Sequence, residues 1–101
     1  MKVILSIDLT MKDGSWDLLG VEKEVDLDFL PNEGDEIADN GISFKVEGRV
    51  FNISEKFVDI YLIGLEILDE DHKKDILKRM DDSGWYYRDP ETYNLLDEIK
   101  N

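Results

Sequence analysis

Apolar side chains recur at every second position along much of the chain before residue 63, and this period constrains the fold more than any other feature. A period of two is that of a β-strand with one buried face. We therefore predict strands over residues 1–11 and 16–30, joined by a turn at Asp13-Gly14. The side chains expected on their inner faces are Val3, Leu5, Ile7, Leu9 and Met11, then Val21, Lys23, Val25, Leu27 and Phe29.

A second pair of strands is predicted after residue 34. A short extended piece at 35–38 leads into Asn40-Gly41, a residue pair typical of tight turns, and a strand over 42–53 follows. Gly48 inside that strand indicates a bulge or a sharp bend, which would let a small sheet coil into a barrel. Its expected inner residues are Ile42, Phe44, Val46 and Val50.

The segment 57–68 is predicted to be a strand that is apolar on both sides toward its end. One alternation consists of Val58, Ile60 and Leu62, and the opposite one of Ile63, Leu65 and Ile67. A strand with two apolar sides must be covered on the second side, so another layer is expected there.

Two helices are expected to provide this cover. In residues 69–82, Asp69 or Asp71 would cap a helix whose apolar stripe is Ile76, Leu77 and Met80, and Ser83-Gly84 would end it. Asp89-Pro90-Glu91 resembles a second helix start, because a proline at the first helical position costs no hydrogen bond. Tyr93 and Leu96 would give that helix an apolar side.

The elements together predict an α+β protein: a strongly bent antiparallel sheet or small open β-barrel of about five strands, followed by two C-terminal helices. We expect a single domain over residues 1–101, in which residues 1–68 form the barrel-like sheet and residues 69–101 form the two-helix cover.

One segment resembles a known kind of domain. LPNEGDEI followed by GISFKVEGRVF is similar to the turn and strand of many small bacterial and phage β-barrel domains, in which a Pro-x-x-Gly-Asp turn precedes two strands. The resemblance covers about 25 residues and implies a compact barrel. Those domains are mostly of unassigned function, so the resemblance implies no active residue.

Charge limits the partners of this chain. It contains 25 acidic residues against 12 lysines and arginines, which gives a formal net charge of −13. This charge opposes direct binding to nucleic acid or to an anionic membrane, so we expect a basic or neutral protein partner. The longest apolar stretch, residues 60–68, is about half of what crosses a bilayer, and we expect a cytoplasmic protein without membrane contact.

The sequence lacks the motifs of the common kinds of enzyme. There is no cysteine, the single histidine is His72, and no glycine-rich loop precedes Lys-Ser or Lys-Thr. A calcium loop ending at Gly41 would need Ala38 as a ligand, which an alanine cannot supply. We therefore expect a protein that is not an enzyme and has no cofactor or metal site. Weak divalent-cation binding stays open as an alternative for a cluster of loop acids: Glu33, Asp35, Glu36 and Asp39.

The first candidate binding surface is an acidic face. Alternate residues of a strand lie about 6.7 Å apart on one side, so the acids of the second predicted strand would form a row. That row and the acids that follow it are Glu22, Glu24, Asp26, Asp28, Glu33, Asp35, Glu36 and Asp39. If Asp8, Asp13 and Asp17 join them, the face could imitate nucleic-acid phosphates and block a basic partner, as small acidic anti-restriction and anti-CRISPR inhibitors do. The alternative is that these charges serve solubility only.

The second candidate surface is aromatic. Trp85, Tyr86, Tyr87 and Arg88 are residue types that anchor protein interfaces, so this run could bind a partner or a second copy of the chain. The competing interpretation is that these aromatic side chains seal the junction between helix and sheet.

Overall fold

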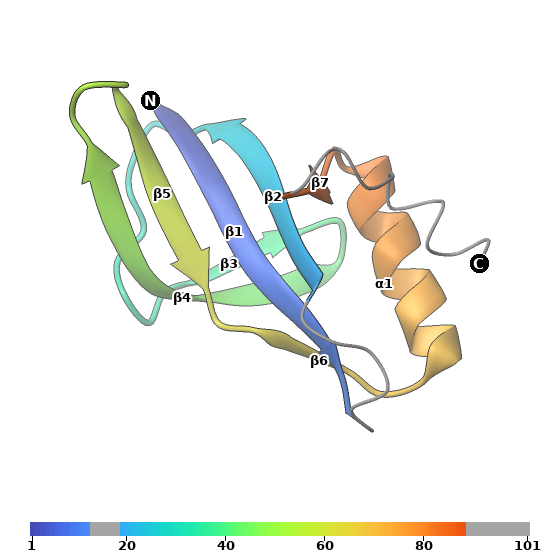
Figure 1. Ribbon diagram of the computed structural model, residues 1–101. Coiled ribbons are helices and arrows are strands. Elements are labelled where there is room, and N and C mark those ends of the chain that lie inside the picture. The colour runs from blue at the N-terminus through green and yellow to red at the C-terminus, as the bar shows by residue number, and fades with distance from the viewer. Residues whose placement is uncertain (13–18, 89–101) are drawn as a thin grey trace.

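The computed structural model describes residues 1–12 and 19–88, which form a strongly curled half-barrel sheet and one helix (Figure 1). The strand order in the sheet is β3-β4-β5-β1-β2-β7, and β6 also pairs with β1. The elements are β1 (Lys2–Met11), β2 (Leu19–Asp26), β3 (Glu36–Asp39), β4 (Ile42–Asn52), β5 (Phe57–Leu62), β6 (Leu65–Ile67), α1 (Glu70–Asp82) and β7 (Tyr86–Tyr87). The bent sheet expected from the sequence is therefore present, with more and shorter strands.

The sheet is mixed, so the expectation of an antiparallel sheet was wrong for its centre. β1 runs antiparallel to β2, where Val3 faces Val25, but parallel to β5, where Val3 faces Val58. It is also parallel to β6. The chain crosses from β2 to β3 and β4 on the far side of the sheet before it returns to β1 as β5. Parallel pairing requires a long connection of this kind, which alternation along a strand does not reveal.

A bulge in β4 reverses the predicted faces of its second half. Val46 faces Leu62, but Gly48 faces Tyr61, so Glu47 is the extra residue. One extra residue moves every later side chain to the other face. Val50, which we expected in the core, is therefore 48% exposed, and the bulge that Gly48 predicted is the cause.

A second irregularity divides the predicted strand 57–68 into β5 and β6. Leu5 faces Ile60, whereas Leu9, four residues later, faces Leu65, five residues later. The chain between β5 and β6 therefore contains one residue more than β1 does over the same distance. The extra residue lies around Gly64 and returns Ile67 to the core, where it is fully buried, while Ile63 is exposed. The two apolar alternations thus belong to two strands with one shared inner face.

β2 ends earlier than predicted. It stops at Asp26, and the backbone N–H of Leu27 then donates to the carbonyl of Met1. Phe29 is 71% exposed and not on an inner face. The part of the predicted strand before Leu19, with its turn at Asp13-Gly14, lies outside the described residues.

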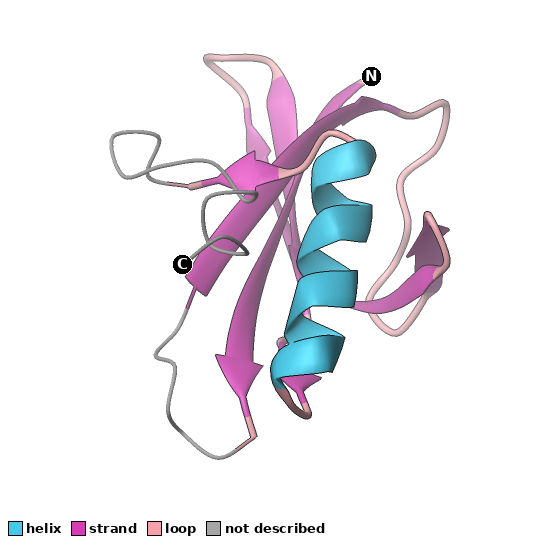
Figure 2. Ribbon diagram, turned by 90° about the vertical axis from the view of Figure 1, so that its right-hand side faces the viewer, coloured by secondary structure: helices cyan, strands magenta, loops and turns pink. Residues whose placement is uncertain are grey.

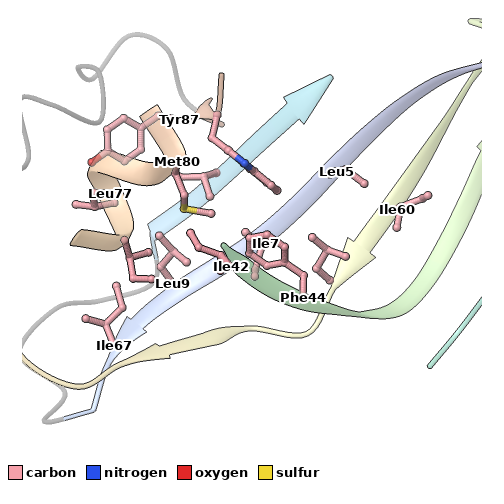
Figure 3. Packing of buried hydrophobic residues seen from close by; sticks show 14 of the residues in the cluster. Leu5, Ile7, Leu9, Ile42, Phe44, Ile60, Ile67, Leu77, Met80 and Tyr87 are labelled. Carbon is pink, nitrogen blue, oxygen red and sulfur yellow. The ribbon is translucent and has the colours of Figure 1, made fainter. Parts of the chain in front are cut away.

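The helix α1 follows the sequence expectation closely. Asp69 caps it, because its carboxylate accepts a hydrogen bond of 2.8 Å from the backbone N–H of His72. The predicted stripe is buried. The helix lies over the sheet (Figure 2), and Leu77 and Met80 point from it toward Leu9 and Ile42 (Figure 3). The second helix, expected from Asp89 onward, lies outside the described residues. None of the described helical residues forms a helix that is long and apolar enough to span a bilayer.

The turn between β3 and β4 closes against the end of α1. Asn40 and Gly41 both have positive φ, 48° and 81°, as this tight turn requires. The Asn40 amide donates at 2.9 Å to the carbonyl of Arg79 in the last turn of the helix, which also accepts from the Ser83 hydroxyl. A hairpin tip therefore fixes the position of a helix that follows it by almost 30 residues.

Leu77→Ala is expected to lower the free energy of unfolding by about 2–5 kcal/mol, because it leaves a cavity where the helix meets the half-barrel. Leu77 is fully buried, whereas the neighbouring Lys78 is exposed. Urea denaturation of both variants measures the difference. Lys78→Ala should stay within about 0.5 kcal/mol of the parent chain. Equal effects of the two changes would show that α1 does not cover the core.

Candidate partner-binding surface

The predicted acidic row is present on β2, but its charges have cationic neighbours. Glu24 pairs with the Lys2 ammonium at 3.0 Å, and Asp26 pairs with the amino group of Met1. Glu22 accepts a hydrogen bond of 3.0 Å from the Ser6 hydroxyl. These side chains project from the face of the sheet opposite the core. The row is therefore a partly neutralised surface.

Arg88 extends this compensation at the β7 end of the row. Its guanidinium lies 3.4 Å from the carboxylate of Asp8 and 3.7 Å from that of Glu22. The absence of a side chain at Gly20 makes room for it, since a Cβ there would lie 2.8 Å from Cζ of Arg88. Arg88, expected in an aromatic binding patch, is thus placed against the acidic face.

The loop between β2 and β3, together with the first residue of β3, carries the more available carboxylates. We call Asp28, Glu33, Asp35 and Glu36 the acidic loop, and all four are exposed. Within the part of the chain that the structure describes, no cation lies at ion-pair distance from any of them. Asp35 also shapes the loop, because its carboxylate accepts a bond of 2.7 Å from the N–H of Asn32 and its carbonyl accepts one from Val46.

Asp39 differs from the other predicted binding acids because it joins two edges of the curled sheet. Its carboxylate oxygen accepts from the ammonium of Lys23 in β2 at 2.6 Å and from the indole N–H of Trp85 at 2.9 Å. Asp39 belongs to β3, at the opposite end of the strand order from β2 and β7. We call these three residues the edge clasp. Asp39 is used inside the fold and is not part of an open acidic surface.

The aromatic run is divided between core and surface. Trp85 is 3% exposed, with its ring centroid 5.3 Å from that of Phe44, and Tyr87 is also buried. The structure therefore leaves Tyr86 and Arg88 as the members of this run that a partner could contact. Burial, followed by the charges of Glu22 and Glu24, raises the pKa of the Tyr86 phenol above its ordinary value.

No group of three or more acidic or histidine side chains approaches a metal-binding arrangement within residues 1–12 and 19–88. His72 is also engaged locally, since its Nδ1 accepts a hydrogen bond of 3.0 Å from the N–H of Leu68. The described chain therefore offers no observation that favours divalent-cation binding by the acidic loop and Asp39.

Sequence reasoning missed an apolar surface at the tip of the β4–β5 hairpin. Val50, Phe51 and Ile53 are 48%, 55% and 88% exposed. A hollow of about 220 Å³ opens beside them, lined by Met1, Phe51, Asn52, Ile53, Lys56, Phe57 and Val58. Gly48 was the available signal for Val50 alone, because a bulge at that position moves Val50 to the outer face and Phe51 to the inner one.

Comparison of the chain with protein-family models, with curated proteins and with solved structures finds no match. The candidate surfaces therefore rest on their own geometry and charge.

Asp39→Ala is expected to lower the free energy of unfolding by about 1–3 kcal/mol, because it leaves the Trp85 N–H and the Lys23 ammonium without their acceptor. Asp39→Asn should cost less, since an amide oxygen can still accept from Trp85. Urea denaturation measures both, with the exposed acid Asp28 changed to Ala as the control. If Asp39→Ala is as harmless as Asp28→Ala, the edge clasp does not hold the sheet together.

Proposed function

We propose that this chain is a non-catalytic interaction domain that binds a basic surface of another protein, with the acidic loop as its principal contact. The supporting observation is that four exposed carboxylates occur within residues 28–36, with no cation at ion-pair distance within the described chain. A charge that is already paired gains less from a new cation than an unpaired one, because its field is partly cancelled. The acidic loop therefore contributes more attraction than the row on β2.

The most concrete form of this proposal is inhibition by imitation of nucleic-acid phosphates. Duplex DNA carries one charge per ~1.7 Å of its axis, so a single strand with acids about 6.7 Å apart is too sparse to imitate it. Asp28 follows the row formed by Glu22, Glu24 and Asp26 after two residues, and the other acids of the acidic loop lie beside β4, where Gly34 and Asp35 bond to Val46. A basic groove that contacts both would meet a denser negative surface. Its association would be fast and sensitive to salt.

The alternative is binding through Tyr86 and Arg88, with the acidic surface serving solubility. Tyr86 is 43% exposed and directly faces Glu22 across the β2–β7 pair. Both side chains therefore lie beside the acidic row, and a partner that contacts them would also meet carboxylates. Without Trp85 as an exposed anchor, this alternative has a smaller apolar contact to offer.

The proposal predicts that reversing three members of the acidic loop, Asp28→Lys, Glu33→Lys and Glu36→Lys, abolishes binding to the basic partner without unfolding the domain. Asp35 is left unchanged because it shapes the loop. The row on β2 is also left unchanged, because Lys2 forms an ion pair with Glu24 there. The measurement is retention of proteins from the native cell extract at low and at high salt. The retained partner should be a nucleic-acid-binding protein that added duplex DNA releases.

The matched control reverses three exposed acids elsewhere in the chain, Glu47, Glu55 and Glu66, and produces the same change in net charge. This variant should bind as the parent does. Equal loss of binding in both variants would mean that total charge and not the acidic loop is recognised. If no salt-sensitive partner is retained by the parent chain, the proposal fails and the acidic surface serves solubility.

A further inference from the structure

The outer edge of β4 has no strand partner beyond its first half. β3 pairs with β4 only as far as Lys45, and the backbone of Val46 then bonds to Gly34 and Asp35. From Gly48 to Asn52, β4 is paired with β5 alone within the described sheet. Figure 1 shows this part of β4 at the margin of the sheet. An unpaired strand edge is a template for another strand.

The direction of the backbone groups on this edge follows from the hairpin. The carbonyl of Asn52 accepts from the N–H of Lys56 inside the β4–β5 turn, so Asn52 points its backbone groups toward β5. Successive strand residues alternate in this respect. Phe51 therefore points its N–H and C=O to the open side. Val50 points its own toward β5, and Arg49 again points to the open side.

The side chains of this edge are mostly apolar, in contrast to those on the free part of β2. Charged side chains are one of the means by which natural edge strands are protected, as Lys23, Glu24 and Asp26 protect β2. On β4 the exposed side chains after the bulge are Arg49, Val50 and Phe51, and Ile53 follows at 88% exposure. Arg49 lies over the Phe51 ring, with 5.6 Å between its Cζ and the ring centroid.

Charge selects the kind of partner that this edge fits. The β4–β5 hairpin, Ile42–Leu62, holds three acids (Glu47, Glu55, Asp59) and three bases (Lys45, Arg49, Lys56), so its net charge is zero. All of the excess charge of −13 is therefore on the rest of the chain. Two copies that meet elsewhere bring like charges together. At this hairpin they meet with balanced charge and matching apolar side chains.

We propose that two copies of the chain associate through this edge, with their β4 strands antiparallel and related by a two-fold axis at Val50. Arg49 of each copy then faces Phe51 of the other, and each such pair exchanges two backbone hydrogen bonds. The same register places each guanidinium next to a Phe51 ring of the second copy as well as its own. Val50 meets its own counterpart as a close, non-hydrogen-bonded pair.

Sedimentation equilibrium of the parent chain tests the association, and Phe51→Lys tests its place. This substitution puts an ammonium opposite Arg49 of the second copy and should raise the dimer dissociation constant about tenfold or more. Leu68→Lys, at an exposed leucine outside the hairpin, should leave it unchanged. Added salt should strengthen the dimer, because it screens the repulsion between two acidic chains, whereas the basic partner of the acidic loop is lost with salt. A parent chain that stays monomeric up to about 1 mM overturns the proposal.

A single cysteine tests the register, since the sequence contains none of its own. Residues of a non-hydrogen-bonded antiparallel pair have Cα atoms about 4.5 Å apart, within the range that a disulfide spans. Val50→Cys should therefore form a covalent dimer under mild oxidation at least about tenfold faster than Ile63→Cys, whose parent residue is equally exposed at 48%. Equal rates overturn the two-fold register. If the chain stays monomeric and a synthetic acidic peptide binds to this edge, the dimer proposal is overturned and the edge binds a strand of another protein.

Discussion

The half-barrel depends on a contact between strands that lie at opposite ends of its strand order. A curled sheet that does not close by backbone pairing needs side chains to hold its ends together, and here one carboxylate does so. Asp39 of β3 accepts from Lys23 of β2 and from the Trp85 indole. The adjoining turn at Asn40 and Gly41 rests on the end of α1. This corner therefore brings β3, β2 and the Trp85 segment together beside the end of α1.

The alternation of apolar residues predicted most strands and the buried stripe of α1, because a half-buried strand or helix imposes its period on the sequence. It did not predict which strands pair, since parallel and antiparallel neighbours leave the same period. Nor did it place Val50, because one extra residue at Glu47 reverses every later position. Gly48 indicated the bulge, and the reversal follows from it by a physical rule.

The candidate surfaces were only partly predictable for a different reason. A carboxylate has the same appearance in a sequence whether it faces water, a lysine or an indole. Asp28 and Asp39 were equivalent in that respect, yet one is exposed and the other joins two strands. The aromatic run Trp85-Tyr86-Tyr87 alternates between core and surface. That alternation becomes predictable only when β7 is recognised as a strand, and two residues are too few to establish a period.

The central position of β1 has a consequence for the order of assembly. Among the described strands β1 is synthesised before the others, but its neighbours on one side, β5 and β6, are separated from it by the whole of β2, β3 and β4. Val3 cannot meet Val58 until the intervening chain has been made. During synthesis the β1–β2 pair therefore exists for a time with one edge of β1 unpaired and with its apolar face exposed to water. Contacts between such distant segments also slow folding.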